Sequence, residues 1–419
     1  MFPILEPLQT TALPALLFLV WLPLFVLLRE RPTRLFFCLT SLVTLVIVAG
    51  PPLAGALLLA SALGYVLIEG AATLRNGRRA ATVVLALLFH ATYWASFHLP
   101  LPAGYAQAEL RAADRPGIFL FFSGIALTFF RLLSYMHERL RLGAARLAPA
   151  DYLTYMLFFP QFRHGPIERP HSFALRLRQA RARWTVAEMR RGLARVGFGL
   201  LSLAAGGGLV VLTGRCLAGS TAHNLARAWE QPQDLTLPQL LLVLHVPGLF
   251  LYAVESGFAS VQLGVARVFG VVGTENFRFP FMATDPGKFW RRWNISLSSW
   301  LRDYAYIPLG GRHRHKYLNV LLVFIYCGVL HGWQMRFLVW GISVGGTTAG
   351  YAWLADRLRP RARSWVVRHR WLAASARLGA RLLTLHWFCL GATIVFDPES
   401  CGYRVLRQYV VTLWALVSP

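Results

Sequence analysis

One histidine of this sequence lies inside an apolar run, where an ionisable side chain is costly. The run reads NVLLVFIYCGVLHGW at residues 319–333, and the histidine is His331. Ionisable residues within apolar membrane segments usually face a cavity and carry function, and a neighbouring glycine such as Gly332 lets a ligand approach closely. Histidine can take a proton from a hydroxyl group near neutral pH. We therefore predict a general base at His331, the alternative being a packed, hydrogen-bonded interior residue.

A polar and aromatic segment precedes this run and reads FWRRWNISLSSWLRDYAYIPLGG at residues 289–311. Its Asn294 is the second predicted catalytic residue: an amide can donate a hydrogen bond to a developing oxyanion or to the carrier arm of an acyl donor, but it cannot shuttle protons. The alternative is an amide on a helix surface that makes only a local hydrogen bond.

Basic residues surround Asn294 and could hold phosphate groups, because the arginine fork fits phosphate oxygens. We predict that they bind the phosphates of coenzyme A or of a carrier's phosphopantetheine; ordinary cytoplasmic loop charges are the alternative. The predicted donor-binding residues are Lys288, Trp290, Arg291, Arg292, Trp293 and Arg302.

The aromatic residues of this segment recur at helical spacing. Trp290, Trp293, Leu297, Trp300 and Tyr304 would share one face of a single amphipathic helix. Proline and a glycine pair follow at 308–311 and would end that helix. Tryptophans at an apolar–polar boundary favour a helix that lies in the membrane interface or lines a wet cavity.

The rest of the chain must place these residues within a membrane. The 419 residues are 56% hydrophobic, and their mean hydropathy is +0.48. Apolar runs recur at about the 20-residue length that crosses a bilayer. We predict an all-α polytopic membrane protein with one domain over residues 1–419. The predicted spans lie near 13–28, 35–49, 52–68, 80–97, 117–135, 192–213, 238–256, 317–332, 337–355, 372–395 and 403–418.

Two further stretches do not fit a simple span. Residues 151–173 contain an apolar segment that ends at Pro160, which is too short to cross and indicates a re-entrant or interfacial element. Residues 257–283 are interrupted by three glycines, so we predict no simple span there.

The net charge of +25 comes from arginines in short loops between apolar runs. The positive-inside rule places these loops in the cytoplasm, where they would also contact anionic lipids. This distribution argues against nucleic-acid binding. The first run has no basic residue ahead of it and no small-residue cleavage site after it, so we predict a retained helix whose N-terminus lies outside. The predicted location is the bacterial inner membrane.

The sequence offers no pattern typical of a metal or nucleotide site. The RHRH motif at 312–315 lacks a second pair of ligands at metal spacing, and Gly165 and Pro166 separate His164 from Glu168. Neither a P-loop nor a GxSxG elbow occurs. We predict no metal and no tightly bound cofactor.

Four elements, in this order, resemble the membrane-bound O-acyltransferase superfamily, and its bacterial branch of alginate O-acetylases and teichoic-acid D-alanyltransferases in particular. They are FFPQFRHGPIERPHSF, SGFASVQLGVARVFG, the FWRRWNISLSSWLRDYAYIPLGG segment and the run that contains His331. Together they form a motif core at about residues 150–345, whereas the outer segments agree only in hydropathy.

The resemblance implies a ring of tilted helices and interfacial elements around a central cavity, with His331 where two funnels meet. It implies transfer of an acetyl or other short acyl group from a cytoplasmic thioester, either acyl-CoA or an acyl-carrier protein. The acceptor would be a hydroxyl of an exported polysaccharide, or a relay protein outside the membrane. Acylation of a lipid, small metabolite or teichoic-acid-type polymer is the alternative; a transporter and an inactive scaffold are the others.

The chain departs from the family pattern at four positions. Asn294 replaces a histidine, Leu330 replaces a tryptophan, Ser260 replaces an acidic residue and His164 replaces an alanine. These changes bear on the substrate more than on the class of reaction.

Overall fold

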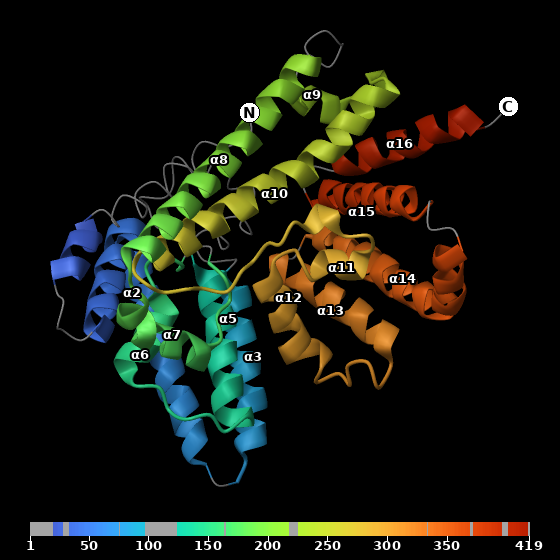
Figure 1. Cartoon of the computed structure of the whole chain (residues 1–419). Helices are drawn as coiled ribbons and strands as arrows, with labels where there is room; N and C mark the ends of the chain where they lie inside the picture. The colour runs from blue at the N-terminus through green and yellow to red at the C-terminus, as the bar shows by residue number, and fades with distance from the viewer. Residues whose placement is uncertain are drawn as a thin grey trace. The chain divides into compact units, whose positions relative to one another are not determined.

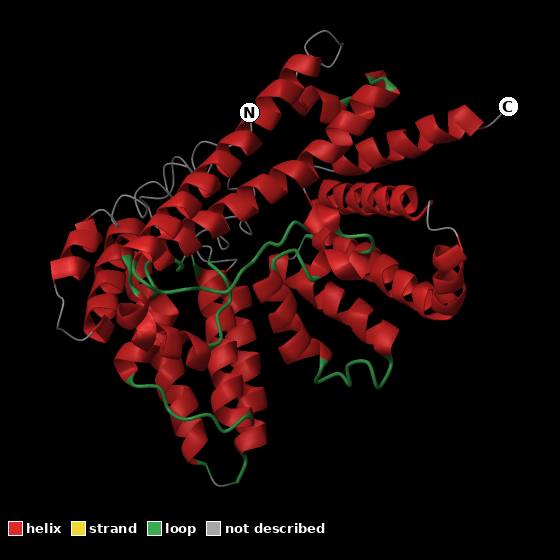
Figure 2. Cartoon of the chain, in the orientation of Figure 1, coloured by secondary structure: helices red, strands yellow, loops and turns green. Residues whose placement is uncertain are grey.

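The computed structural model describes residues 20–27, 33–74, 76–96, 124–162, 165–217, 225–332, 334–368, 372–395 and 401–417. These residues form helices and loops, with no strand in the described ranges (Figure 2). The predicted all-α class is therefore confirmed. The predicted spans at 13–28 and 117–135 lie partly outside the described residues, and His164 lies wholly outside them.

The chain divides into two compact units. The amino-terminal unit comprises Phe2–Leu200 and Phe258–Glu275, and the carboxy-terminal unit comprises Leu201–Gly257 and Asn276–Pro419. The first two boundaries fall inside the long helices α8 (Val186–Leu217) and α10 (Leu237–Val268), and the third lies between Glu275 and Asn276, after α10 has ended.

The other helices of the amino-terminal unit are shown in Figure 1 and include one that covers two predicted spans. They are α2 (Thr33–Thr73), α3 (Arg78–Ser96), α5 (Ile125–Met136), the π-helix η2 (His137–Arg141), α6 (Pro149–Leu157) and α7 (Pro170–Arg183). In α2, Gly50 adopts a positive φ of 73° immediately before Pro51 and Pro52. Proline cannot donate the next helical hydrogen bond, so α2 is kinked between the predicted runs 35–49 and 52–68.

Helix α6 is the short element predicted after residue 150. It spans nine residues, has Pro149 in its first turn and ends before Pro160. It packs against α2, where Tyr152 donates a hydrogen bond to the Ser61 carbonyl at 2.9 Å. Its fully buried Asp151 forms an ion pair with Arg178 of α7 at 2.7 Å. The segment is thus fixed on both sides.

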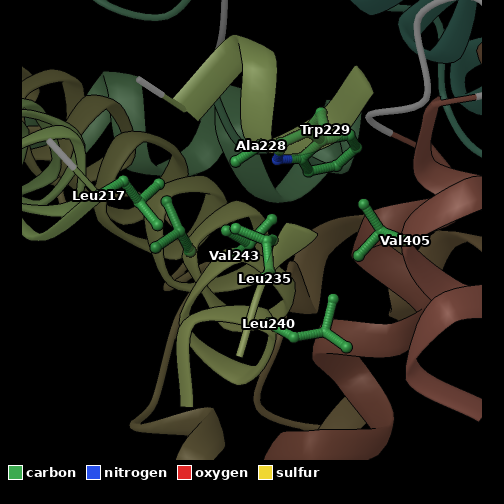
Figure 3. Packing of buried hydrophobic residues seen from close by; sticks show 8 residues of the cluster. Leu217, Ala228, Trp229, Leu235, Leu240, Val243 and Val405 are labelled. Carbon is green, nitrogen blue, oxygen red and sulfur yellow. The ribbon is translucent and has the colours of Figure 1, made fainter. Parts of the chain in front are cut away.

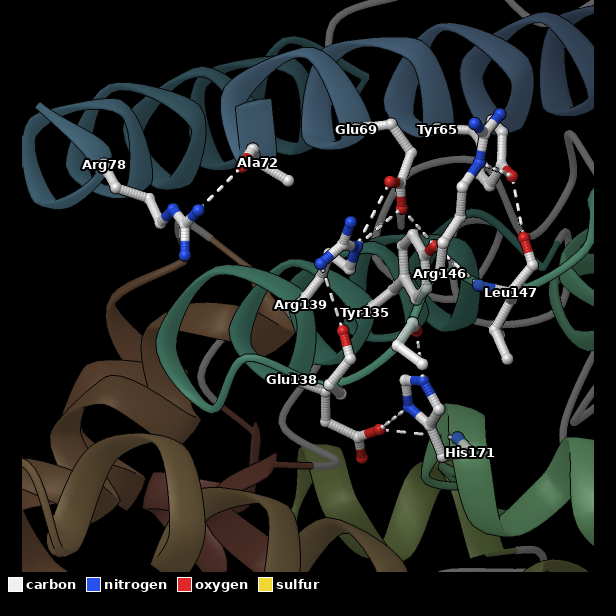
Figure 4. A network of polar contacts seen from close by, with 12 residues as sticks. Tyr65, Glu69, Ala72, Arg78, Tyr135, Glu138, Arg139, Arg146, Leu147 and His171 are labelled. Atoms are coloured by element: carbon white, nitrogen blue, oxygen red, sulfur yellow. Dashed lines mark hydrogen bonds and ion pairs between the residues drawn. The ribbon is translucent and has the colours of Figure 1, made fainter. Parts of the chain in front are cut away.

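A polar network joins α2 to α5 and η2 (Figure 4). Glu69 of α2 accepts hydrogen bonds from Tyr135 at 2.5 Å and from Arg139 at 3.1 Å. Tyr65 donates to the Leu147 carbonyl at 2.7 Å and accepts from Arg146 at 2.8 Å. A carboxylate in an apolar helix is costly unless it is paired and hydrogen-bonded, and this network supplies both conditions.

Helices α8 and α10 touch through two glycines of the amino-terminal unit. A Cβ on Gly192 would lie 2.8 Å from the Gly264 carbonyl oxygen, and a Cβ on Gly264 would lie 2.7 Å from that of Gly192. Residues 257–268 continue α10 as one helix, although the sequence predicted no simple span at 257–283; only the part of that stretch after Val268 lies outside α10. Gly264 lies inside the continuous helix, and the absence of a side chain there allows α8 to approach closely.

The carboxy-terminal unit contains the predicted chemical residues. Its elements are α9 (Leu225–Glu230), η3 (Pro232–Asp234), η4 (Pro280–Met282), α11 (Pro286–Trp290), α12 (Ile295–Leu301), the π-helix η5 (Arg302–Tyr306), α13 (Lys316–His331), α14 (Met335–Arg368), α15 (Ala373–Val395) and α16 (Cys401–Val417). Buried residues around Trp229, including Leu240 and Val243 of α10 and Val405 of α16, form one apolar core (Figure 3).

Four helices of the described chain are long and apolar enough to cross a membrane. They are Ala49–Thr73, Val186–Leu217, Leu237–Val268 and Ala374–Val395, and Arg34–Ile47 and Lys316–His331 are shorter apolar helices. The prediction of a protein with several membrane helices agrees with this finding.

Candidate active site

His331 is the last residue of α13. Its Nδ1 atom lies 2.7 Å from the Cys327 carbonyl oxygen one turn earlier. A carbonyl can only accept, so Nδ1 carries the hydrogen and donates. The neutral ring then has its lone pair on Nε2. The helix therefore fixes the tautomer in which Nε2 can act as a base.

Close packing of α13 against α14 fixes the position of His331. A Cβ on Gly328 would lie 2.2 Å from the Phe337 carbonyl oxygen, and a Cβ on Gly341 would lie 2.7 Å from that of Phe324. The His331 ring lies 6.0 Å from the rings of Phe337 and Trp340, centroid to centroid. Only glycines allow the two backbones this approach, so the half-buried imidazole is held against aromatic rings of α14.

Glu255 of α10 is a site residue that the sequence reasoning missed. Its carboxylate interacts electrostatically with His331, and both residues belong to the carboxy-terminal unit. The sequence feature that identifies Glu255 as a candidate is that it is a single acidic residue inside an apolar run, which usually marks function.

The segment around Asn294 is not the single amphipathic helix expected from its aromatic spacing. Helix α11 ends at Trp290 and α12 begins at Ile295. Between them Asn294 has φ 39° and ψ 58°, in the left-handed region. This conformation breaks a right-handed helix, and asparagine is one of the few residues that tolerate it. The last helical turn of this segment ends at Tyr306, before Pro308 and Gly310, as predicted.

Main-chain hydrogen bonds on both sides of Asn294 hold this break in place. Arg278 donates from its backbone to the Arg292 carbonyl at 3.0 Å, and Ile295 donates to the Asn276 carbonyl at 2.9 Å. The buried Asn276 side chain also accepts from the Ser296 backbone N–H at 3.1 Å. Residues 276–278 thus position Asn294, and Asn276 is a second residue that the sequence reasoning missed.

The two tryptophans predicted to bind the donor belong to an aromatic cluster. Trp293 is 7% exposed, stacks on Phe289 at 5.5 Å and contacts Phe388 in a tilted arrangement at 4.6 Å. Trp290 is half-buried and lies 5.1 Å from Phe324 and 6.1 Å from Trp340. Because Trp340 also flanks His331, Trp290 connects the signature segment to the histidine through one ring.

Most of the predicted phosphate-binding residues have partners on the same segment. Lys288 pairs with Asp285 at 2.7 Å, and Arg302 pairs with Asp303 at 2.8 Å. The Arg292 guanidinium donates to the Arg278 carbonyl at 3.3 Å. Arg291 is exposed. Exposed or half-exposed pairs of this kind are weak, so a phosphate can compete for these side chains.

The structure brings some of the predicted residues together and leaves others apart. Trp290, Trp293 and His331 are joined through the rings of Phe289, Phe388 and Trp340. The Asn294 side chain makes no hydrogen bond to a residue in the described ranges, including His331. No three histidine, cysteine, aspartate or glutamate side chains of the described chain could hold a metal ion.

Comparison with known proteins gives the class of protein to which this fold and site belong. A sequence model of the membrane-bound O-acyltransferase (MBOAT) family matches residues 77–349. That stretch is more than half of the chain, and it contains Asn294, His331 and the basic residues around them. The chain therefore belongs to the membrane-bound O-acyltransferase family.

Individual relatives match different lengths of the chain. A peptidoglycan O-acetyltransferase of Helicobacter pylori is 29% identical over 199 residues, which cover 46% of this chain and 36% of that protein. A probable alginate O-acetylase of Pseudomonas putida is 39% identical over 94 residues, covering 22% and 19%. A teichoic acid D-alanyltransferase of Streptococcus thermophilus is 26% identical over 335 residues, covering 77% and 76%. The chain thus matches about a third of the first relative and a fifth of the second.

Proposed function

We propose that the protein transfers an acetyl or other short acyl group from a cytoplasmic thioester to a hydroxyl acceptor, with His331 as the general base. The observation that carries this proposal is the hydrogen bond from His331 Nδ1 to the Cys327 carbonyl, which leaves Nε2 as the basic nitrogen. Family membership and the acylated polymers named for the relatives support the reaction class.

The proposed step is a direct acyl transfer. His331 Nε2 takes the hydroxyl proton while the acceptor oxygen attacks the thioester carbonyl carbon. The tetrahedral intermediate then collapses, the carbon–sulfur bond breaks, and the imidazolium returns the proton to the leaving thiolate. The Glu255 carboxylate stabilises the imidazolium between the two proton transfers. Asn294 would donate a hydrogen bond to the oxyanion once the substrate is bound.

The donor would be held by the basic segment. Lys288, Arg291, Arg292 and Arg302 would bind the phosphates of acyl-CoA or of a carrier's phosphopantetheine, with Trp290 and Trp293 supporting them from the aromatic cluster. The donor is a substrate, so no tightly bound cofactor is needed. This arrangement rests on the arginine fork as a phosphate ligand and on the weak ion pairs that hold these side chains.

We place the protein in the bacterial inner membrane with its N-terminus outside. The acceptor would be a hydroxyl of an exported polysaccharide, reached directly or through a relay protein on the outer side. D-alanylation of a teichoic-acid-type polymer is a second candidate, because the D-alanyltransferase match covers 76% of that relative. Assays with acetyl and D-alanyl thioesters would distinguish the two.

The test is a base-deletion experiment on the purified protein in lipid nanodiscs. We expect His331→Ala to lower transfer about 10²–10⁴-fold while the thermal unfolding and the binding of a non-hydrolysable acyl-CoA analogue stay as in the wild type. His313→Ala, in an exposed loop, is the matched control and should leave transfer unchanged. Residual activity within about threefold of wild type would remove His331 from the mechanism.

A further inference from the structure

A second histidine cluster lies in the carboxy-terminal unit and has no part in the proposed transfer. His386 of α15 has its Nδ1 atom 3.2 Å from Nε2 of His245 on α10. Its Nε2 atom lies 3.2 Å from the hydroxyl of Tyr409 on α16. His245 Nδ1 lies 2.7 Å from the Leu241 carbonyl oxygen. Three titratable side chains from three helices thus form one hydrogen-bonded chain.

The Leu241 carbonyl fixes the direction of every hydrogen bond in the neutral chain. It can only accept, so His245 carries its hydrogen on Nδ1 and offers a lone pair at Nε2. His386 must then donate from Nδ1 to His245, which leaves its Nε2 as the acceptor for the Tyr409 hydroxyl. Each neutral ring therefore has one fixed tautomer.

The helices that carry the chain are packed tightly where it lies. A Cβ on Gly248 would lie 2.8 Å from the Cys389 sulfur. Thr393 donates to the Leu244 carbonyl at 3.2 Å, and the Cys389 thiol contacts the His245 carbonyl at 3.7 Å. The rings of His245 and His386 are nevertheless only half-buried within the protein.

No contact among the described residues places a carboxylate against these rings. Helices α15 and α16 contain no aspartate or glutamate, and the single acid of α10 is Glu255, about 15 Å along the helix from His245. The groups that face His386 are His245 from α10, Tyr409 from α16 and Cys389 one turn along α15. Trp340, Val344 and Thr347 of α14 contact α15, and η4 consists of Pro280–Met282; none of these residues titrates.

We propose that His245, His386 and Tyr409 form a proton-binding site that takes up one proton, shared between the two rings, and that controls how α15 packs on the aromatic cluster beside the active site. A first proton can enter without loss of a hydrogen bond. On His386 it turns Nε2 into a donor, and the Tyr409 hydroxyl becomes the acceptor. On His245 it reverses the bond between the rings, and His386 then donates from Nε2 to Tyr409.

A second proton cannot bind without the loss of a hydrogen bond. Both facing nitrogens would then carry hydrogens 3.2 Å apart, with two positive rings in contact and no carboxylate beside them. The pair therefore titrates as a unit rather than as two separate histidines. The Leu241 carbonyl closes one end of the chain, so protons enter and leave through the rings or through Tyr409.

Helix α15 connects this site to the residues predicted to bind the donor. The two residues after His386 are Trp387 and Phe388. Trp387 lies 5.9 Å from Phe289 and 6.1 Å from Trp290, and Phe388 lies 4.6 Å from Trp293. Proton binding changes the direction of the hydrogen bonds on the face of α15 that carries His386. The rings of the aromatic cluster pack on the adjacent face of the same helix, so their packing changes with it.

The experiment is a titration of the full-length protein in nanodiscs, with histidine rings labelled with ¹⁵N and followed by NMR. We expect the signals of His245 and His386 to move together in one step between about pH 4 and about pH 9, with one proton bound for the pair. The signals of the exposed His313 and His315 serve as the reference in the same spectra. Two independent steps, or no movement of either ring, would overturn the proposal.

Two variants separate a titrating site from a packing contact. In His245→Gln the joint step should disappear and His386 should titrate alone. Tyr409→Phe keeps both rings and should keep one shared step, displaced in pH. The pH profile of acyl transfer should show the wild-type step and lose it in His245→Gln, with rates at alkaline pH within about threefold. An unchanged profile would refute control of the active site.

Discussion

At the scale of single residues, Asn294 combines a backbone role with a side-chain role. Its left-handed conformation ends α11 and allows α12 to begin, and two main-chain hydrogen bonds to residues 276–278 hold it there. The amide itself makes no hydrogen bond within the described part of the chain. It is thus available to a substrate, as the proposed function requires.

Glycine and alanine at position 294 should separate these roles. Asn294→Gly accepts the left-handed backbone but removes the amide, so we expect wild-type thermal stability and transfer lowered about 10²–10³-fold. Asn294→Ala should lose the same activity and also about 1 kcal/mol of stability. Transfer rates and unfolding midpoints in nanodiscs measure both. If the glycine variant transfers at the wild-type rate, the amide has no catalytic role.

Residue types alone could identify His331 and Asn294 as candidate catalytic residues, but not the neighbouring groups that position them. A histidine in an apolar run and an amide in a polar segment are visible in any sequence. The hydrogen bond from the Ser296 backbone to the Asn276 side chain is not visible in the sequence, because the two residues meet only after the chain has folded back over twenty residues. The Cys327 carbonyl that sets the His331 tautomer follows from helix geometry and could have been foreseen.

At the scale of elements, the aromatic spacing of 290–304 misled because hydropathy cannot distinguish one helix from two short ones in sequence. Trp293 packs against Phe388, whereas Trp300 of α12 lies 5.0 Å from Tyr304 of η5, ring centroid to ring centroid. The break depends on a left-handed residue and on bonds to a distant segment. Helix propensity carries no information about either.

The glycine contact between α8 and α10 gives an element-scale prediction. Gly264→Ala would place a Cβ 2.7 Å from the Gly192 carbonyl oxygen, so we expect a loss of about 1–3 kcal/mol of stability. Gly197→Ala on α8, where nothing lies within 4 Å, is the control and should be neutral or stabilising by up to about 1 kcal/mol. Urea or thermal unfolding of both variants provides the measurement. Equal stability of the two would mean that the helices do not touch here.

At the scale of the whole molecule, composition and run length were enough to predict an all-α membrane protein. They could not predict how far each helix continues. Helix α10 extends twelve residues beyond the predicted end at 256, through a stretch that contains Gly264. The reason is that glycine lowers helix propensity by only about 1 kcal/mol, which close packing on a neighbour can offset.

We predict the orientation in the membrane from the arginine distribution, and the histidine chain adds a constraint on three helix ends. His245, His386 and Tyr409 lie eight, nine and eight residues from the ends Leu237, Val395 and Cys401. At 1.5 Å per residue each is about 12–14 Å from its end. Because the three side chains are hydrogen-bonded together, we predict that these three helix ends lie on the same side of the membrane.

We predict that this side is the outside and that the arginine-rich loops are cytoplasmic. In intact cells a membrane-impermeant maleimide should label the exposed Cys216. Arg183→Cys in a background with Cys216→Ser and Cys401→Ser should react only after permeabilisation. The buried Cys38, Cys327 and Cys389 should stay unlabelled in both states. Labelling at 183 in intact cells would reverse the orientation.

The Gly192–Gly264 crossing has a consequence for sequence variation. Contacting positions are often recognised because a substitution at one is matched by a substitution at the other. Here each Cβ would face the partner's backbone rather than its side chain, so no residue chosen at one position makes room for a larger residue at the other. Related sequences that keep this crossing should show two constant glycines without covariation. Coevolution methods would therefore not detect this approach of α8 and α10.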